Sequence, residues 1–271
     1  SVTIPEFDNP AYQQRILIIN STAPPGTGSA YSLDTNAVSA FYSQVFDSLG
    51  KRGKYDILHL APSPTARFPD FEQLGRYSLL VFLLESKPPG NPGVGRTYTI
   101  DGTRRVRMIQ YAQVGGRLIF SGILDPLINF GGEDNYRRFA SEILHISVPQ
   151  GQPVIQNNIR EFMGMKGRSG YPDIPVDPAK LHADSLGSLR YVALASPFGF
   201  GETIGVFDSR ANNASFEDRS FGVRFLAAPE APPARESFSV VYFGFPLYYG
   251  QTSAVIQGLR KAFDDVKELN R

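Results

Sequence analysis

RILIIN, residues 15–20, is the stretch that decides the fold of this chain. Four consecutive apolar residues form its centre, with no alternation of apolar and polar side chains. In a strand with one solvent-exposed face, apolar and polar residues alternate with a period of two, whereas an unbroken apolar run is typical of a strand covered on both faces. The stretch therefore predicts a central strand of a parallel sheet with helices on each side.

The same kind of run recurs along the chain and is separated each time by helical periodicity. Apolar residues spaced three and four apart predict a helix over residues 33–49. Further strands are predicted over 55–60, 77–84 and 117–120, and further helices over 68–74, 104–114 and 136–144. Regular alternation of strand and helix predicts a three-layer, mostly parallel, doubly wound α/β fold with the flavodoxin-like strand order 2-1-3-4.

The pattern changes between about residues 150 and 235. Prolines are frequent there, and short apolar pieces alternate with turns, which predicts a β-rich insertion or side-sheet. A buried strand over 238–244 and an amphipathic helix over 252–269 then return, and they most simply complete the first sheet. We therefore expect one α/β domain over 15–271, preceded by an extended lead-in or linker from another module over 1–14.

Composition excludes several classes of function. Lys and Arg number 27 against 26 Asp and Glu, so the net charge of +1 argues against a nucleic-acid surface. The chain has no cysteine, which excludes a thiol nucleophile, a disulfide framework and a cysteine zinc site. No apolar run is long enough to span a bilayer.

Neither a P-loop nor a dinucleotide fingerprint is present in register, so no cofactor is expected. The three histidines show no metal-binding spacing, while the acidic loops 173–177 and 208–218 leave a Ca²⁺ site open.

Polar and aromatic residues follow the predicted strands at the sheet edge where ligands bind in open α/β folds. These candidate ligand-binding residues are Ser21, Thr22, Glu85, Ser86, Ser121, Gly122, Phe245 and Tyr248. Their alternative roles are structural: the hydroxyls and the carboxylate would cap loop N–H groups, and the aromatic rings would pack the last helix onto the sheet.

Ser121 stands where hydrolases of the α/β type carry a nucleophile, at the end of a buried strand. A catalytic serine needs a G-x-S-x-G turn and a histidine base. Here Ile119 replaces the first glycine, and neither His59, His145 nor His182 follows a late strand. We therefore assign no catalytic residue, and Ser121 remains a weak candidate.

The order of elements resembles the class I glutamine amidotransferase-like group of flavodoxin-like folds. The resemblance lies in RILIIN, AFYSQVFDSLG, YDILHL, RYSLLVFLLES, YAQVGGRLIFSG and FSVVYFGFPLYY. Active members carry a cysteine in the elbow that GGRLIFSG would form, and a His-Glu pair after a late strand. This chain has neither, so the resemblance implies a non-catalytic variant of the kind found in large secreted or surface-attached bacterial proteins.

Three hypotheses follow from these observations. The first is a non-catalytic scaffold or interaction module of a larger extracytoplasmic protein, secreted, periplasmic or on the cell surface, whose partners are neighbouring domains of the same polypeptide. The second is an esterase-like serine hydrolase that uses Ser121. The third is a module that binds a carbohydrate or another small ligand at the carboxyl edge of the sheet.

Overall fold

The structure is a computed structural model. It describes residues 16–22, 35–60, 68–84, 102–123, 133–147, 154–156, 162–181, 189, 191–210, 217–227 and 238–268. The predicted lead-in over 1–14 lies outside these residues.

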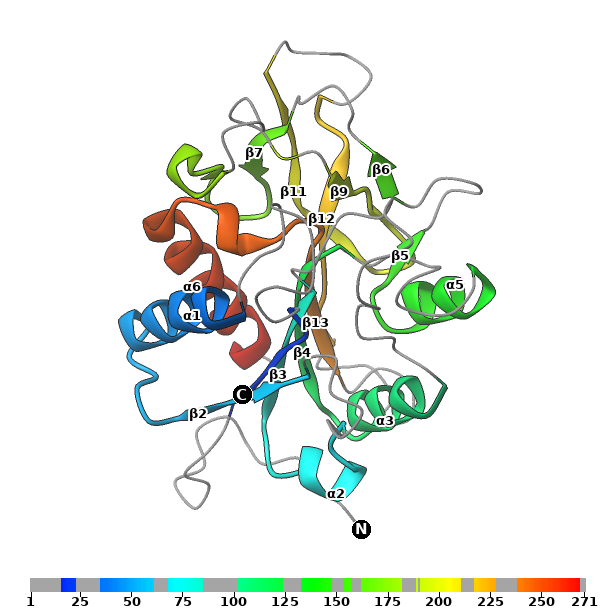
Figure 1. Ribbon diagram of the computed structural model, residues 1–271. Helices are drawn as coiled ribbons and strands as arrows, with labels where there is room; N and C mark the ends of the chain where they lie inside the picture. Colours follow the sequence, from blue (N-terminus) through cyan, green and yellow to red (C-terminus); the bar gives the residue numbers. More distant parts are fainter. Residues whose placement is uncertain are drawn as a thin grey trace, which may run out of the picture.

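A parallel sheet forms the centre of the fold (Figure 1). Its strands are β1 (Ile16–Asn20), β2 (Tyr55–His59), β3 (Leu79–Leu84), β4 (Arg117–Gly122) and β13 (Ser239–Phe243). They lie in the order β2-β1-β3-β4-β13, and every neighbouring pair is parallel. The order 2-1-3-4 is the predicted one, and the last strand rejoins the sheet next to β4.

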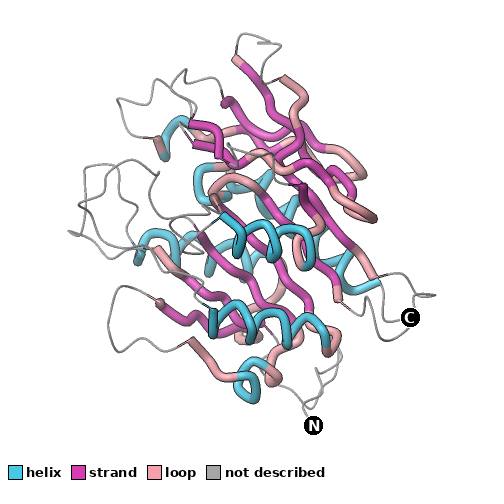
Figure 2. Tube along the Cα trace, turned by 90° about the vertical axis from the view of Figure 1, so that its right-hand side faces the viewer, coloured by secondary structure: helices cyan, strands magenta, loops and turns pink. Residues whose placement is uncertain are grey.

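Helices cover both faces of this sheet, which gives three layers. Helices α1 (Thr35–Ser48) and α6 (Thr252–Glu268) lie on one face, and α2 (Phe71–Leu74), α3 (Gly102–Gln113) and α5 (Glu133–Glu142) lie on the other (Figures 1 and 2). The buried side chains form two separate apolar cores. One lies between α1, α6 and the sheet, and the other lies beneath α3 and α5.

The insertion is β-rich, and its main strands extend the central sheet instead of forming a separate side-sheet. They are β7 (Phe162–Gly167), β8 (Ile174–Pro175), β11 (Glu202–Ser209) and β12 (Ser220–Phe225). They follow β13 in the order β12-β11-β7-β8, all antiparallel, so the sheet has nine strands. Figure 1 shows this extension above the parallel half.

Two small ladders complete the insertion. Strand β5 (Ile146–Ser147) pairs with β10 (Ser196–Pro197), and β6 (Val154–Gln156) pairs with β9 (Tyr191–Ala193). Single 3-10 turns, η1 (Pro178–Lys180) and η3 (Leu247–Tyr249), join the larger elements. None of the helices in the described part of the chain is long and apolar enough to cross a membrane.

Candidate functional site

Ser121 lies at the carboxyl end of β4, and its hydroxyl is enclosed. The residue is 1% exposed. Its Oγ lies 3.0 Å from the hydroxyl oxygen of Tyr42 on α1 and accepts the N–H of Leu247 at 3.1 Å. The following Gly122 has φ 112°, a value that favours glycine, and its N–H donates to the carbonyl of Phe245 at 3.1 Å. Two successive residues of β4 are thus tied to the segment that follows β13.

His59 and His145 lie far from the Ser121 hydroxyl. His59 is in register with Asn20, Asn20 with Leu83, and Leu83 with Ser121, which places three strand spacings, about 14 Å, between His59 and Ser121. His145 lies on the opposite face of the sheet, because its ring stacks on Phe225 in the core beneath α3 and α5. His182 lies outside the described residues.

The environment of His145 decides its charge. The residue follows α5, where a charged imidazole would interact favourably with the helix dipole. The residue instead adopts φ 51°, and its ring lies 3.6 Å from that of Phe225. Burial lowers the pKa of His145 to about 4, so the imidazole is neutral at physiological pH.

The exit of β1 is held by its own polar side chains. The Ser21 hydroxyl donates to the Leu83 carbonyl at 2.5 Å, and the Asn20 amide donates to the Ser39 hydroxyl on α1 at 2.9 Å. The Thr22 N–H donates a hydrogen bond to Asn20 Oδ1 at 2.9 Å, and the Thr22 carbonyl accepts one from the Thr35 hydroxyl at 2.6 Å. The hydroxyl of Thr22 is buried and has no hydrogen-bond partner within the described structure.

The remaining candidates divide into two groups. Glu85 and Ser86 lie outside the described residues. Phe245 is fully buried, and its ring packs against those of Phe162 and Phe221 in the insertion. Tyr248 is half-buried and meets the ring of Phe41 edge-on at 5.4 Å. Since Leu83 is in register with Ser121, the structure brings Ser21, Ser121, Gly122 and Phe245 close together.

Sequence reasoning missed the partner of the segment after β13. Backbone bonds join it to the β8–η1 region: the Asp177 N–H donates to the Tyr249 carbonyl at 2.7 Å, and the Gln251 N–H donates to the Pro175 carbonyl at 2.9 Å. The ammonium of Lys180 donates to the Gly250 carbonyl at 2.7 Å and lies 4.1 Å from the centre of the Phe41 ring. We call residues 245–251 the β13 exit segment. It is held by β4 and by the insertion at the same time.

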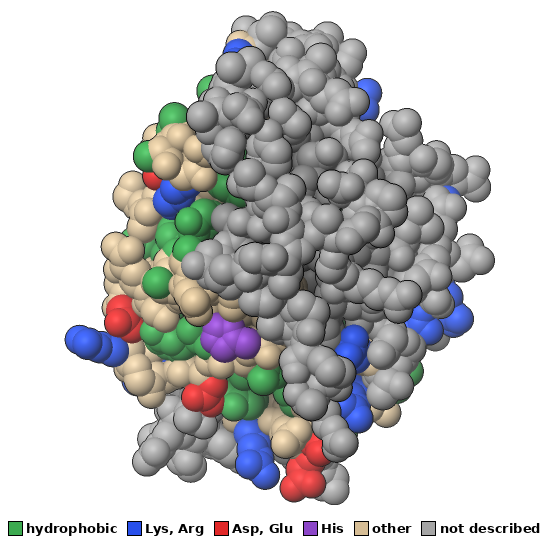
Figure 3. Space-filling model, in the orientation of Figure 1, with side chains coloured by type: hydrophobic (Ala, Val, Ile, Leu, Met, Phe, Trp, Pro, Cys, Tyr) green, Lys and Arg blue, Asp and Glu red, His purple; other side chains and the backbone are tan. Residues whose placement is uncertain are grey.

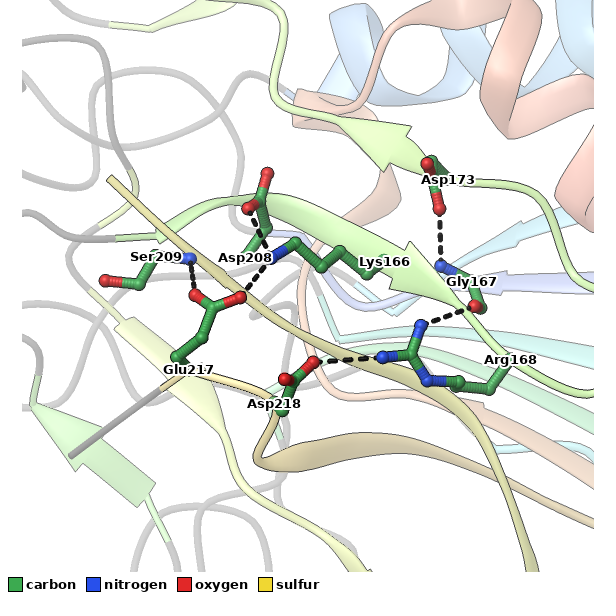
Figure 4. Close-up of polar contacts among 8 residues, drawn as sticks. All are labelled: Lys166, Gly167, Arg168, Asp173, Asp208, Ser209, Glu217 and Asp218. Carbon is green, nitrogen blue, oxygen red and sulfur yellow. Dashed lines mark hydrogen bonds and ion pairs between the residues drawn. The ribbon is translucent and has the colours of Figure 1, made fainter. Parts of the chain in front are cut away.

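A second polar cluster lies on the extension of the sheet, where sequence reasoning left a Ca²⁺ site open (Figure 4). Lys166 lies between the carboxylates of Asp208 and Glu217, and the hydrogen bond that its ammonium donates to Glu217 is the main cause of its raised pKa. Glu217 also accepts the N–H of Ser209, and Asp218 pairs with Arg168 at 2.9 Å.

The carboxylates of the other acidic loop also have protein donors. Asp173 accepts the Gly167 N–H at 2.7 Å, and Asp177 accepts the Ala179 N–H at 3.0 Å. Among the described residues no group of three or more His, Asp or Glu side chains is arranged to hold a metal ion. The geometry of both loops, as far as it is described, is that of ion pairs and capped turns.

Comparison with known proteins identifies the fold. No family model and no curated protein matches the sequence. Among solved structures, the β-galactosidase from Rahnella sp. R3 matches 95% of this chain with a TM-score of 0.54 and 12% identity, and that from Bacillus circulans sp. alkalophilus matches 94% with 0.52 and 9%. The chain spans about a third of their lengths, 32% and 31% respectively.

A further similar structure is a cytoplasmic protein from Salmonella typhimurium, with a TM-score of 0.50 and 13% identity. There the match covers 93% of this chain and 98% of the other. At these identities the similarity is one of fold alone. The fold thus occurs both as one part of a long enzyme chain and as almost the whole of a shorter protein.

Proposed function

We propose that this chain is a non-catalytic α/β module that serves as a scaffold or interaction domain within a larger protein. The observation that carries the proposal is the state of the Ser121 hydroxyl. At the position where related folds carry a nucleophile, the oxygen is buried and accepts a backbone N–H, and the strand exits beside it are tied to one another.

A nucleophilic serine needs a base within hydrogen-bond reach and a path for its substrate. Tyr42 is not the partner that a nucleophilic serine uses, because the base beside such a serine is usually a histidine held by a carboxylate. His59 and His145 belong to other parts of the molecule, as their strand register and ring contacts indicate. These observations disfavour the esterase hypothesis.

A ligand-binding role at the carboxyl edge is the second candidate. One observation favours it: the buried Thr22 hydroxyl lacks a protein partner within the described structure, and a small polar ligand would supply one. Phe245 offers no surface for a sugar, because its ring is fully buried. The larger protein is proposed to be extracytoplasmic on the resemblance alone, and fractionation of the full-length gene product tests that part.

The absence of cysteine allows a sharp test of the Ser121 proposal. In a Ser121→Cys variant the new thiol is the only one in the chain, and its reaction with a thiol reagent reports how open this position is. The matched control is Ser48→Cys at the exposed end of α1. Both variants are titrated with a chromogenic disulfide reagent, folded and in denaturant, with circular dichroism to verify the fold.

We expect the folded Ser121→Cys thiol to react about a thousandfold more slowly than the Ser48→Cys thiol. That ratio corresponds to about 4 kcal/mol for the opening that exposes it. Equal rates in denaturant would attribute the difference to the fold. A folded Ser121→Cys thiol that reacts as fast as the control, or faster, would mean an open and activated position, and the non-catalytic proposal would fail.

A further inference from the structure

Two large aromatic side chains are exposed on one ordered turn of the insertion. Phe198 is 53% exposed and Phe200 is 77% exposed, on the turn between β10 and β11. We call residues 196–201 the aromatic turn. Exposed apolar residues scattered singly are ordinary, whereas two exposed aromatic residues within one six-residue turn indicate a contact surface.

The turn is built to hold this conformation. Its first two residues pair with β5, the Phe198 N–H donates to the His145 carbonyl at 2.7 Å, and the Gly201 N–H donates to the Phe198 carbonyl at 3.0 Å. Gly199 has φ 59°, and a Cβ at Gly201 would lie 2.5 Å from the His145 carbonyl oxygen. Glycine is favoured at Gly199 by its positive φ and required at Gly201 by the close approach of the His145 carbonyl, so the rings are presented by a backbone that has little freedom.

The base of the turn is equally well anchored. Glu202 accepts two hydrogen bonds from Arg224, at 2.9 and 2.7 Å, and Arg224 donates a third to the buried Asp265 on α6 at 2.7 Å. A rigid support lowers the entropy cost of binding, because few torsions are lost when a partner covers the rings. The turn thus combines apolar surface with prior order, as the anchor residues of protein interfaces do.

The chemistry of the turn distinguishes among possible partners. Its six residues carry no charge, and the neighbouring Glu202 is paired with Arg224, so the turn carries no basic residue that would attract an anionic membrane surface. A single side-chain hydroxyl, that of Ser196, is available to a sugar, whereas sugar and small-ligand sites need several convergent polar groups. An apolar protein surface fits best, with a basic group beside Glu202 Oε1, since both bonds from Arg224 go to Oε2.

Helix α3 offers such a surface on the same molecule. The other exposed large hydrophobic residues among those described are Val106 on α3, at 47%, and Val114 directly after it, at 39%. The helix carries three arginines and no acidic residue. In Figure 1, α3 lies on the same side of the sheet as β5, the strand to which the aromatic turn is paired.

We propose that the aromatic turn of one copy of this chain docks on helix α3 of a second copy. Phe198 and Phe200 would cover Val106 and Val114, and Glu202 would face the arginines of α3. In a twofold-symmetric dimer the same contact forms twice, because the turn and the helix of each copy meet the helix and the turn of the other. This inference goes beyond the proposed function and does not depend on what Ser121 does.

The test is the oligomeric state of the whole chain, measured by sedimentation equilibrium between about 1 µM and 1 mM, the range of weak association. Two variants alter the two sides of the contact, Phe200→Glu on the turn and Val106→Lys on α3. Gln257→Glu, an exposed residue of α6 on the other face of the sheet, is the matched control. Circular dichroism and thermal melting verify that each variant folds.

We expect the wild type and the control to dimerise. Either substitution alters both copies of the contact, so we expect it to raise the dissociation constant about a thousandfold, since loss of an anchor residue costs about thirtyfold at each contact. An equimolar mixture of the two variants should form a one-to-one pair, since one native contact survives and the other becomes a Glu–Lys pair. A wild type that stays monomeric throughout, or a dimer that neither substitution weakens, overturns the proposal. A mixture that stays monomeric overturns the pairing of the turn with α3.

Discussion

Replacing Ser121 by alanine tests the structural role of its hydroxyl directly. The Leu247 N–H would lose its acceptor, and the Tyr42 hydroxyl would lose a partner at 3.0 Å, both in a buried environment. A buried polar group left without a partner costs about 1 to 3 kcal/mol. For two groups, one of which retains other contacts, we expect a loss of about 2 to 4 kcal/mol in the free energy of unfolding. In a chain of this size that loss lowers Tm by roughly 5 to 10 °C.

The measurement is urea unfolding followed by circular dichroism, with calorimetry for Tm. Ser48→Ala is the control, because that hydroxyl is exposed and bonds locally to Gln44, so its removal should cost no more than about 0.5 kcal/mol. Tyr42→Phe completes a double-mutant cycle with Ser121→Ala, in which we expect a coupling of about 1 kcal/mol. If Ser121→Ala cost less than about 0.5 kcal/mol, the hydroxyl would not hold the β13 exit segment, and the main support for the proposed function would be lost.

Two further predictions concern groups away from this site. His145 has a folded pKa of about 4, below its ordinary value, so the unfolded state binds more protons between about pH 4 and 6.5 and stability falls as the pH falls through that window. Because the ring is partly exposed, we expect the free energy of unfolding to fall by about 1 to 2 kcal/mol across that pH window. The variant His145→Asn should remove this loss, and asparagine is chosen because it tolerates the positive φ of the position. The measurement compares the unfolding of the variant and the wild type at pH 4.5 and 7.5. An unchanged pH dependence in the variant would assign the loss to other groups. Asp265 is 2% exposed and pairs with Arg224 and Lys261. We therefore expect Asp265→Ala to lower the free energy of unfolding, measured in urea, by about 3 kcal/mol. A change within about 0.5 kcal/mol would mean that these ion pairs add nothing net to stability.

The parallel half of the fold could be predicted because its signals are local. Each strand is an unbroken apolar run and each helix has a periodic apolar face, so element type and order follow from short stretches. Tyr42 belongs to the apolar spacing that predicts the helix over residues 33–49. Its bond to Ser121 was not predictable, because 79 residues separate the two, and 126 separate Ser121 from Leu247.

The strands that extend the sheet were difficult to predict from the sequence because they contain glycines. Strand β7 reads FMGMKG, which looks like a turn. Its glycines are required because the β7–β8 hairpin brings two backbones together: a Cβ at Gly164 would lie 2.6 Å from the Ile174 carbonyl oxygen, and one at Gly167 would lie 2.0 Å from that of Tyr171. Glycine within a strand marks such close approach as often as it marks a break. A glycine at a close approach can be distinguished from a glycine that ends a strand only when the paired strand is known, and that strand lies elsewhere in the chain.

The β13 exit segment shows how an insertion can change what a fold is able to do. Active sites of open α/β folds lie on loops beyond the carboxyl ends of the strands, where a rigid sheet carries segments that are free to vary. Here the segment after β13 is bonded to β4 through Ser121 and Gly122, and to the insertion through Pro175 and Asp177. A ligand that entered at this point would have to break bonds on both sides at once. The same insertion presents the two exposed rings of the aromatic turn about a fixed backbone. It therefore closes the described edge of the sheet beside β4, and the outward surface that it offers is the one for which we propose contact with a second copy of the chain.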